Sequence, residues 1–546
     1  MAPLRPISDV ARDLGLSSDE ALPAGPQVLK VPLAVVRRRA DGPKGRLVLV
    51  TAMTPTSHGE GKTVVSIGLA MALRRLGHRA VVCLRQPSLG PVFGLKGGAS
   101  GGGRSTVEPA EEVNLGLTGD LSAIADAHNL LAALLENHLY HGNALDLQRS
   151  AISWPRTLDV EDRVLRHIVV DAGGGEKAVA RESSFVIAAA SELTAIHGLV
   201  RDVPDLKARI GRILVGERGE GLPARAGDVQ ATGAMAALLR SAIKPNLLQT
   251  CDGTPALVHG GPFANIAHGT TTRLSIELAL ATTDFAVVEA GFSTELGAEK
   301  FVDIVARSAG FQVAAAVLIA TLRGLRRQGG VPDASQAEPN PAAVERGLDN
   351  LGRHIANLRA LSLTPLIALN RFPGDTPEEI ELVRRFAGTL GVPIEEVSPF
   401  TDGADGALDL ARRVAATDAS GARGRPLYPD GTGIADAIRT IATTLYGASD
   451  VRFAPQFDED LRRLTRYGEL AGPVCIAKTP LSLTDDPKRV GPVHDFVPTV
   501  RRLWRAAGAG FTVAYLGTIE TMPGLPSHPL ADRIDLTDDG RVVGLG

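Results

Sequence analysis

Thr56-Ser57-His58-Gly59-Glu60-Gly61-Lys62-Thr63 is the stretch that decides the fold of this chain. An apolar run, Leu47 to Val50, comes before it, and an alanine- and leucine-rich helical pattern, Ser66 to Leu76, follows it. Strand, glycine-bearing loop ending in Gly-Lys-Thr, and helix is the order of a phosphate-binding loop, although Thr56 replaces its usual first glycine. The alternative is a glycine-rich turn that caps an ordinary helix. The order of the three segments favours the phosphate-binding loop.

The residue types of this loop suit the binding of a nucleotide. Glycines allow backbone N–H groups to turn inward around phosphate oxygens, and the helix N-terminus adds partial positive charge. Lys62 can reach the β- and γ-phosphates, and the hydroxyl of Thr63 can bind Mg²⁺. We therefore predict that ATP binds to Thr56, Ser57, His58, Gly59, Glu60, Gly61, Lys62 and Thr63.

Apolar runs typical of strands alternate with helical patterns on both sides of this loop. From residue 46 to about 355 these runs are 47–51, 80–84, 167–170, 285–289 and 313–320. The alternation predicts an α/β fold of the phosphate-loop NTPase type, with a doubly wound, largely parallel sheet and two smaller α/β domains. We expect a nucleotide-binding domain with an N-terminal arm (1–355), a second α/β domain on the acceptor side (356–450) and a C-terminal α/β domain (451–546).

Composition narrows the possible functions. The 546 residues carry a formal net charge of −3, which favours neither nucleic acid nor an anionic membrane surface as a partner. The three cysteines lie far apart and predict neither a disulfide framework nor a zinc site, so we expect a reducing cytoplasm. The N-terminus has no apolar core of a signal peptide, and the longest apolar run, 313–322, is too short to span a membrane.

Candidate chemistry is expected where strands end, because ligands of open parallel sheets bind at the carboxyl ends of the strands. The run 80–84 ends in Arg85, whose guanidinium could stabilise a transferring phosphoryl group; a surface salt bridge is the alternative. The run 285–289 ends in Glu289, which suits a Mg²⁺ shell, but many strands end in carboxylates. The glycine-rich stretch 96–103 could bind an anion, act as a lid or be a plain loop, and 259–269 favours backbone contact with a ligand over a metal site.

Several longer motifs now resemble one family. They are Thr54-Pro55-Thr56 running into 59–63, Leu84-Arg85-Gln86-Pro87-Ser88-Leu89-Gly90-Pro91, Asn265-Ile266-Ala267-His268-Gly269, Glu289-Ala290-Gly291-Phe292, Leu296-Gly297-Ala298-Glu299-Lys300-Phe301 and Met522-Pro523-Gly524-Leu525-Pro526. In this order they are similar to formate–tetrahydrofolate ligase, also called formyltetrahydrofolate synthetase. The resemblance extends from the N-terminal arm to the last few residues.

The resemblance implies an ATP-dependent ligase of one-carbon metabolism. In such an enzyme formate attacks the γ-phosphoryl group of MgATP, giving formyl phosphate, and N10 of tetrahydrofolate then takes the formyl group. It implies catalytic roles for Lys62, Arg85 and Gln86, and a pterin platform of Phe372 and Phe400, for which core packing is the alternative. It further implies activation by a monovalent cation (K⁺ or NH₄⁺) and a homotetramer.

The chain departs from the family pattern at several positions. Gln86 replaces a glutamate, Ser122 a histidine, and Ser293-Thr294-Glu295 a Gly-Ala-Asp segment; Asp402 reverses the charge of a lysine beside the second aromatic residue. The phosphate loop is intact while the acceptor side is altered. Three interpretations therefore remain: the folate enzyme, a ligase of the same fold for another carboxylate or amine, or a nucleotide-binding protein without catalysis.

Overall fold

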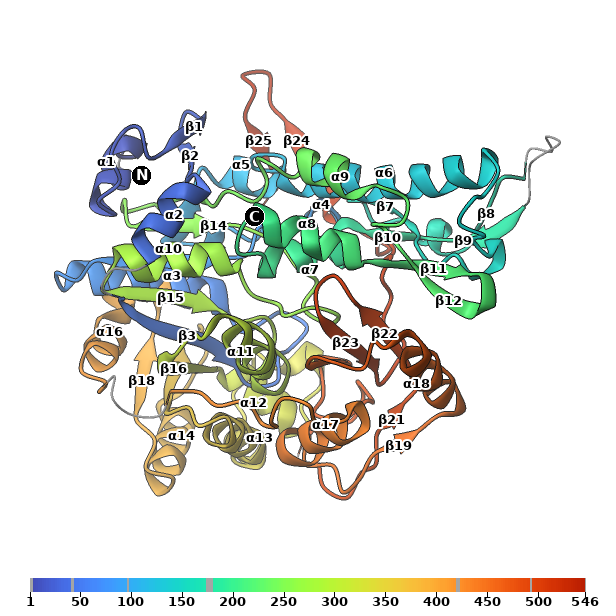
Figure 1. Ribbon diagram of the computed structural model, residues 1–546. Helices are drawn as coiled ribbons and strands as arrows, with labels where there is room; N and C mark the ends of the chain where they lie inside the picture. The colour runs from blue at the N-terminus through green and yellow to red at the C-terminus, as the bar shows by residue number, and fades with distance from the viewer. Residues whose placement is uncertain are drawn as a thin grey trace.

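The computed structural model describes residues 3–40, 44–95, 98–172, 180–418, 423–491 and 493–545. Within these residues, twelve strands form one large sheet (Figure 1). They are β1 (Leu22–Gly25), β2 (Val28–Lys30), β3 (Arg46–Ala52), β4 (Ala80–Leu84), β5 (Gly101–Gly102), β6 (Ser105–Glu108), β13 (Asn246–Thr250), β14 (Pro255–Val258), β15 (Phe285–Glu289), β16 (Val313–Ala320), β17 (Pro365–Asn370) and β18 (Ile394–Val397).

The sheet is largely parallel. Its order is β1-β2-β13-β14-β4-β15-β3-β16-β17-β18, with β6 paired to β13 and β5 to β6. All neighbours from β14 to β18 run parallel, whereas β1, β2, β13 and β6 pair antiparallel at the other side. The predicted α/β fold with a largely parallel sheet is thus confirmed, with β3, the strand before the phosphate loop, near its centre.

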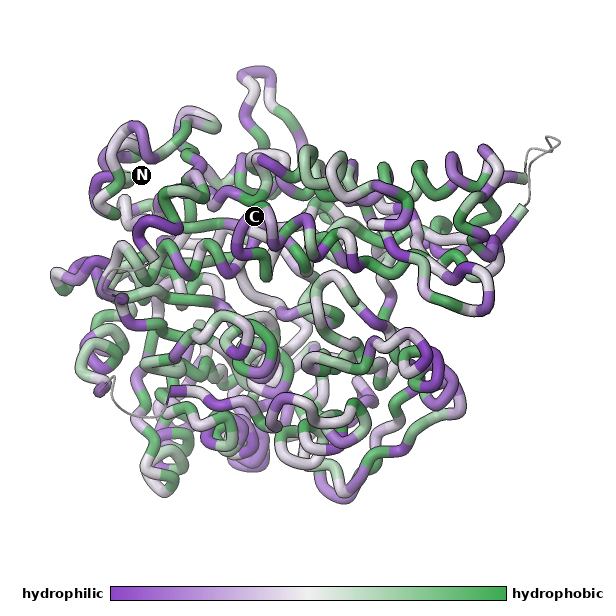
Figure 2. The backbone as a smooth tube through the Cα atoms, viewed as in Figure 1, coloured by the Kyte–Doolittle hydropathy of each residue, from purple (hydrophilic) through white to green (hydrophobic). Residues whose placement is uncertain are grey.

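Helices cover both faces of this sheet, and the last two helices of the chain pack around a separate apolar cluster. Their bounds are α1 (Ile7–Asp13), α2 (Leu33–Ala40), α3 (Lys62–Arg75), α4 (Leu89–Phe93), α5 (Ala110–Asn114), α6 (Asp120–Tyr140), α7 (Glu192–Leu199), α8 (Val203–Arg212), α9 (Thr232–Leu238), α10 (Arg273–Thr282), α11 (Arg307–Ala309), α12 (Leu322–Gln328), α13 (Pro341–Ala360), α14 (Pro377–Thr389), α15 (Pro399–Asp402), α16 (Leu408–Ala415), α17 (Ile434–Ile441) and α18 (Pro455–Tyr467). The tube in Figure 2 shows how apolar residues concentrate in the strands and on the inward sides of these helices.

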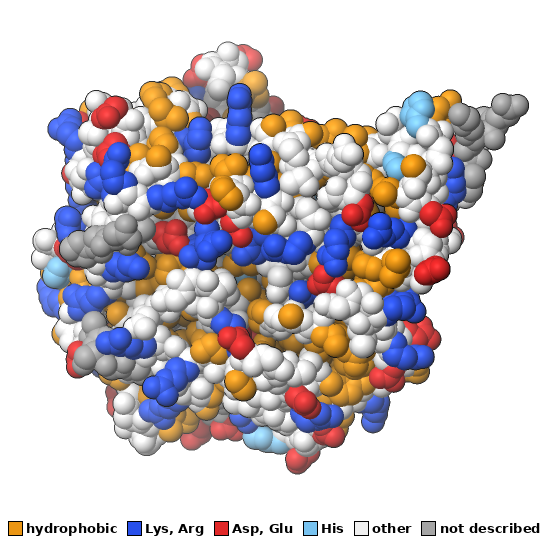
Figure 3. Space-filling model, in the orientation of Figure 1, with side chains coloured by type: hydrophobic (Ala, Val, Ile, Leu, Met, Phe, Trp, Pro, Cys, Tyr) orange, Lys and Arg blue, Asp and Glu red, His pale blue; other side chains and the backbone are white. Residues whose placement is uncertain are grey.

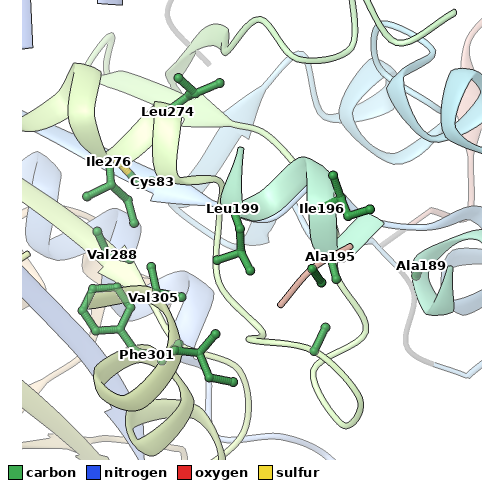
Figure 4. Close-up of a cluster of buried hydrophobic side chains, with 14 of the residues drawn as sticks. Cys83, Ala189, Ala195, Ile196, Leu199, Leu274, Ile276, Val288, Phe301 and Val305 are labelled. Carbon is green, nitrogen blue, oxygen red and sulfur yellow. The ribbon is translucent and has the colours of Figure 1, made fainter. Parts of the chain in front are cut away.

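Alternation along β3 explains why both faces are covered. Leu47 and Leu49 belong to one buried apolar cluster, and Val48 and Val50 to another, as expected when successive side chains point to opposite faces. Apolar residues of α10 and α13 belong to the first cluster, and those of α3 and α16 to the second. Figure 4 shows part of the first cluster, which includes Cys83, Ile276, Val288 and Phe301. A strand that is apolar on both sides is typical of a doubly wound sheet.

Smaller sheets lie outside the large one. They are β7 (Arg156–Leu158) with β10 (Phe185–Ile187), β8 (Ile168–Val170) with β9 (Arg181–Ser183), β11 (Leu214–Arg218) with β12 (Leu222–Arg225), β19 (Arg452–Phe453) with β21 (Thr499–Val500), β20 (Val474–Ala477) with β23 (Phe511–Tyr515) and β22 (Arg502–Ala506), and β24 (Asp535–Leu536) with β25 (Val542–Val543). The run 167–170, expected in the main sheet, is a strand but lies in the β8–β9 ribbon. Its Val169 is 59% exposed, so this short strand lacks the two buried faces of a central position.

The chain after α13 contributes to two bodies of structure. Strands β17 and β18 continue the large sheet beyond β16, and the domain boundary predicted at residue 355 lies within α13. The segment from α17 onward packs around an apolar cluster of its own and contains the β20-β23-β22 sheet, drawn in orange to red in Figure 1. We call residues 434–516 the C-terminal unit. The division of the chain into domains stays a prediction.

Two further properties concern the charges on the surface and the apolar character of the helices. The face in Figure 3 mixes basic and acidic side chains, with a band of Lys and Arg side chains across its middle. Among the residues that the structure describes, no helix combines the length and the apolar composition that a membrane crossing needs.

Candidate active site at the carboxyl ends of the parallel strands

The predicted strand–loop–helix is confirmed. Strand β3 ends at Ala52, and α3 begins at Lys62 after a loop in which Gly59 and Gly61 have φ of 76° and 74°. A Cβ at Gly61 would lie 2.6 Å from Nδ2 of Asn370, so both the backbone conformation and the space require glycine there. The loop therefore brings backbone N–H groups to the N-terminus of a long helix, an arrangement suited to phosphate.

Glu60 closes this loop on itself. Its carboxylate accepts the backbone N–H of Thr56 at 2.6 Å and the hydroxyl of Thr321, at the end of β16. Its carbonyl accepts Nδ2 of Asn370, at the end of β17, at 3.1 Å. Glu60 is 1% exposed, so these hydrogen bonds are buried. They attach the loop to the ends of two neighbouring strands, β16 and β17.

Three other predicted residues meet in front of the loop, each from a different element. The hydroxyl of Thr63, in the first turn of α3, donates to Oε2 of Glu289 at 2.7 Å. Nη2 of Arg85, directly after β4, lies 3.6 Å from Oε1 of the same carboxylate, while its buried Nε has no hydrogen-bond partner in the part of the chain that the structure describes. Lys62 lies beside them: burial lowers its pKa and the charge of Arg85 adds to this, although the carboxylates of Glu289 and Glu60 oppose it.

Gln86 follows Arg85 and is almost fully buried. Its backbone N–H donates to the carbonyl of Gly260 at 2.7 Å, and its Nε2 donates to the carbonyl of Gly116 at 3.3 Å. Its Oε1 accepts no hydrogen bond from any residue that the structure describes. The amide therefore fits this place, where a glutamate would turn a second acceptor toward the Gly116 carbonyl.

Sequence reasoning missed the importance of His268. Both of its ring nitrogens are buried and have no hydrogen-bond partner among the described residues, and burial, followed by the charge of Arg85, lowers its pKa to about 3. The loop around it is tied down by Lys300, whose Nζ donates to the carbonyls of Ala264 and Asn265 at 2.7 and 2.9 Å. The motif Asn265–Gly269 was visible in the sequence, but nothing local indicated that its histidine would lie near Arg85.

The other histidine of this segment has a structural setting. His259 hydrogen-bonds to Thr272 through Nδ1 at 2.7 Å and to the carbonyl of Ala242 through Nε2 at 2.7 Å. No group of three or more His, Cys, Asp or Glu side chains suited to a metal occurs in the described parts of the chain. Of the glycine-rich stretch 96–103, Lys96 and Gly97 lie outside the described residues.

The two predicted pterin-binding aromatics follow neighbouring parallel strands. Phe372 lies two residues after the end of β17, and Phe400 follows β18 in the short helix α15. The guanidinium carbon of Arg323 lies 4.6 Å from the centre of the Phe372 ring. Phe400 is 57% exposed, and its carbonyl accepts the N–H of Arg104 at 2.8 Å. Because parallel neighbours end on one edge of the sheet, both rings lie on the same edge as the phosphate loop.

Comparison with known proteins identifies the family. A model of the family described as formate–tetrahydrofolate ligase matches residues 1–546. The chain belongs to the formate–tetrahydrofolate ligase family. A formate–tetrahydrofolate ligase from Roseiflexus sp. (strain RS-1) is 47% identical over 553 residues, covering 100% of this chain and 98% of that protein. Those from a Nocardioides species and Paracoccus denitrificans are 48% and 47% identical, covering 100% and 99% of this chain and 98% and 97% of their own lengths.

Membership of the formate–tetrahydrofolate ligase family confirms the resemblance seen in the sequence. It also gives the departures from the family pattern a place in the fold. Ser122 is exposed on α6, and Asp402 is exposed at the end of α15, where Ser398 and Thr401 donate to its carboxylate. Thr294 is fully buried and hydrogen-bonds to His354 at 2.7 Å. The departures thus lie in different settings, and each can be tested separately.

Proposed function

We propose that this protein joins formate to N10 of tetrahydrofolate at the expense of ATP, with formyl phosphate as the intermediate. The observation that carries the proposal is the meeting of Thr63, Arg85 and Glu289 in front of a glycine-bearing loop and helix N-terminus. Family membership over the whole chain supports the same reaction. Formate itself is a poor acyl donor, so phosphorylation is the step that makes the later C–N bond accessible.

The first step transfers a phosphoryl group. A formate oxygen attacks the γ-phosphorus, the bond to the bridging oxygen of ATP breaks, and ADP leaves with the electron pair. Such a transfer depends on positioning and on neutralising charge. Lys62 and the loop N–H groups suit the β- and γ-phosphates. Arg85 forms an ion pair with Glu289, which orients its guanidinium before substrate arrives.

The donor set also suits Mg²⁺. Thr63 supplies a hydroxyl and Glu289 a carboxylate, and their oxygens are already within hydrogen-bond distance of each other. Hard oxygen ligands of this kind, completed by phosphate oxygens and water, are what Mg²⁺ prefers. Bound there, Mg²⁺ would neutralise charge on the phosphate chain. Thr63 and Glu289 would be its protein ligands.

The second step makes the C–N bond. The N10 amine attacks the formyl carbon, the C–O bond to phosphate breaks, and N10 loses its proton. We propose that Phe372 and Phe400 bracket the pterin, since both rings lie at the edge where the first step occurs and Phe400 offers a largely exposed face. We further propose a homotetramer, activation by K⁺ or NH₄⁺ and a cytoplasmic location, which the family resemblance supports.

A substrate-omission assay tests the reaction. Purified protein is incubated with MgATP, formate and tetrahydrofolate, and folate product and ADP are followed, then each substrate is left out in turn. We expect product only with all three. If ADP forms with another acid or amine but not with formate or tetrahydrofolate, that compound is the substrate and the proposed reaction is wrong. Nucleotide binding without any turnover would overturn the proposal of catalysis.

Arg85 and Arg79 give a matched pair for the first step, because they flank the same strand, β4. Arg85→Lys should lower kcat about tenfold or more, since the ammonium group of lysine cannot reproduce the planar, multiply donating guanidinium group of arginine. Arg79→Lys, in an exposed ion pair with Asp284, should leave kcat unchanged. An Arg85→Lys variant with full kcat would remove Arg85 from the mechanism.

A further inference from the structure

A buried polar cluster lies behind the phosphate loop. His354 of α13, Glu295 and Lys478 have no exposed surface, and the structure brings them together from three distant segments. Nε2 of His354 lies 2.8 Å from the backbone N of Thr54 and 2.9 Å from its hydroxyl oxygen. Thr54 stands between the end of β3 and Thr56, so this histidine contacts the point where the chain enters the loop.

The hydrogen bonds fix the tautomer of His354. A backbone N–H can only donate, so Nε2 must offer its lone pair to Thr54. The neutral ring then carries its proton on Nδ1, which lies 2.7 Å from Oγ1 of Thr294. Oγ1 also accepts Nδ2 of Asn357 at 3.1 Å. Protonation of Nε2 would place two donors against each other at Thr54; consistently, burial lowers the pKa of His354 to about 4, although Glu295 opposes this.

The same cluster reaches the C-terminal unit. Oε2 of Glu295 lies 3.6 Å from Nδ1 of His354, and its Oε1 lies 3.3 Å from Nζ of Lys478. Lys478 directly follows β20, and it also donates to the carbonyls of Thr479, at 2.9 Å, and Ser482. A buried charge left without its partner is costly, so this arrangement holds Glu295 and the strand end together.

A second chain of hydrogen bonds leads from the C-terminal unit to the same threonine. The N–H of Gly491 donates to Oε1 of Gln328 at 3.1 Å, and Nδ2 of Asn350 approaches that oxygen at 3.5 Å. The same Nδ2 donates to Oγ1 of Thr54 at 3.0 Å. Two routes from the C-terminal unit therefore converge on Thr54.

We propose that His354 is a positioning residue for the phosphate loop, and that the C-terminal unit takes part in holding ATP through Lys478, Glu295 and His354. The inference rests on the proposed function, because it takes residues 56–63 as the ATP site. His354 touches no substrate; it acts by fixing the entry to a loop whose N–H groups must face phosphate oxygens. A small displacement of such groups weakens both binding and transfer.

Replacing His354 by asparagine or by glutamine tests the roles of its two ring nitrogens separately. Asparagine can reproduce the Nδ1–H donor but not the acceptor at Nε2, whereas glutamine can place an oxygen near Thr54. We expect His354→Asn to raise the Kd for MgATP and to lower kcat, each about tenfold, with the KM for formate unchanged. His354→Gln should restore most of both losses.

His128 supplies the matched control. It is equally buried, and it hydrogen-bonds to Ser191 at 2.8 Å and to the carbonyl of Pro155 at 2.9 Å, away from the loop. His128→Asn should lower the melting temperature as His354→Asn does, while Kd for MgATP and kcat stay at wild-type values. Equal Kd values in wild type and His354→Asn, or a loss that His354→Gln shares, would overturn the positioning role.

A second variant keeps the inference testable if His354→Asn does not fold. Lys478→Met replaces the side chain with the buried ammonium group by an apolar side chain of similar length. This change should raise the Kd for MgATP although Lys478 lies outside the loop. An unchanged Kd would overturn the part assigned to the C-terminal unit. If wild type binds MgATP but forms no product, the proposed function fails, and the Kd comparison among the variants still decides the positioning role.

Discussion

The phosphate loop and the acceptor-side aromatics share one edge of the sheet but differ in how firmly the protein holds them. Around the loop, Thr54 and Glu60 are 0% and 1% exposed, and their polar atoms bond to three other segments of the chain, namely α13 and the ends of β16 and β17. On the acceptor side Phe400 is 57% exposed. Charge development in phosphoryl transfer requires donors fixed in advance, whereas a flat ring can gain its contacts when the acceptor binds.

This contrast matches only some of the departures from the family pattern, because Asp402 is exposed whereas Gln86 and Thr294 are buried close to the loop side. A substitution in the phosphate loop itself would break hydrogen bonds that hold the loop in place. The family pattern of the phosphate loop is intact. Asp402, on the acceptor side, is exposed, and its carboxylate accepts hydrogen bonds from Ser398 and Thr401 in its own turn. We therefore expect single substitutions to cost most at the loop and least at the acceptor side.

The largest effect is expected from Lys62→Ala. It removes the loop side chain that can neutralise the β- and γ-phosphates, so turnover should fall by two or more orders of magnitude, about 3 kcal/mol or more of transition-state stabilisation. Single-turnover ADP formation measures it. Lys207→Ala, at an exposed position of α8, is the control that should keep wild-type turnover. Unchanged turnover in Lys62→Ala would refute the assignment of the loop.

Acid should destabilise the protein through the buried His354 behind the phosphate loop. The unfolded chain protonates His354 near its ordinary pKa of 6.5, but the folded protein does so only near 4. Between these values the unfolded state binds the extra proton, so the free energy of unfolding falls as the pH falls, by about 3 kcal/mol in total. Groups facing the ring are Glu295 and Lys478 from other segments and Arg353 of α13.

Urea unfolding at several pH values measures this effect. His354→Gln cannot titrate, so its stability should fall less steeply than that of wild type between pH 6.5 and 4, and the difference should vanish above pH 7. Identical slopes for the two proteins would show that His354 is protonated in the folded state.

Sequence alone predicted what depends on local pattern. Residues 47–63 carry a strand, a glycine loop and a helix within one short stretch, and the rule for parallel sheets placed Arg85 and Glu289 at the same edge. It could not predict the link between Thr54 and His354, which are far apart in the chain and bear no shared motif. It also could not separate β8 from the main sheet, because a short apolar run does not reveal its partner strand.

A moderate effect is expected at the aromatic pair. Phe372→Ala and Phe400→Ala should each raise the KM for the acceptor about tenfold, on the order of 1.4 kcal/mol of lost ring contact, with the KM for ATP unchanged. Replacement by tyrosine should be mild in both. Steady-state kinetics with each substrate varied in turn decides the matter. A fall in melting temperature together with equal effects on both KM values would instead assign the rings to packing.

The smallest effect is expected from reversing one charge on the acceptor side. The glutamate tail of tetrahydrofolate is anionic, and Asp402 places a carboxylate beside the second aromatic residue. Asp402→Lys should lower the KM for tetrahydrofolate about two- to threefold, the scale of an exposed ion pair, and Asp402→Asn by less. The gain should shrink in 1 M salt, because the Debye length falls to about 3 Å. Asp436→Lys, exposed on α17 in the C-terminal unit, changes net charge equally and should leave the KM unchanged. A gain that persists in high salt, or that Asp436→Lys shares, would place the glutamate tail away from Asp402.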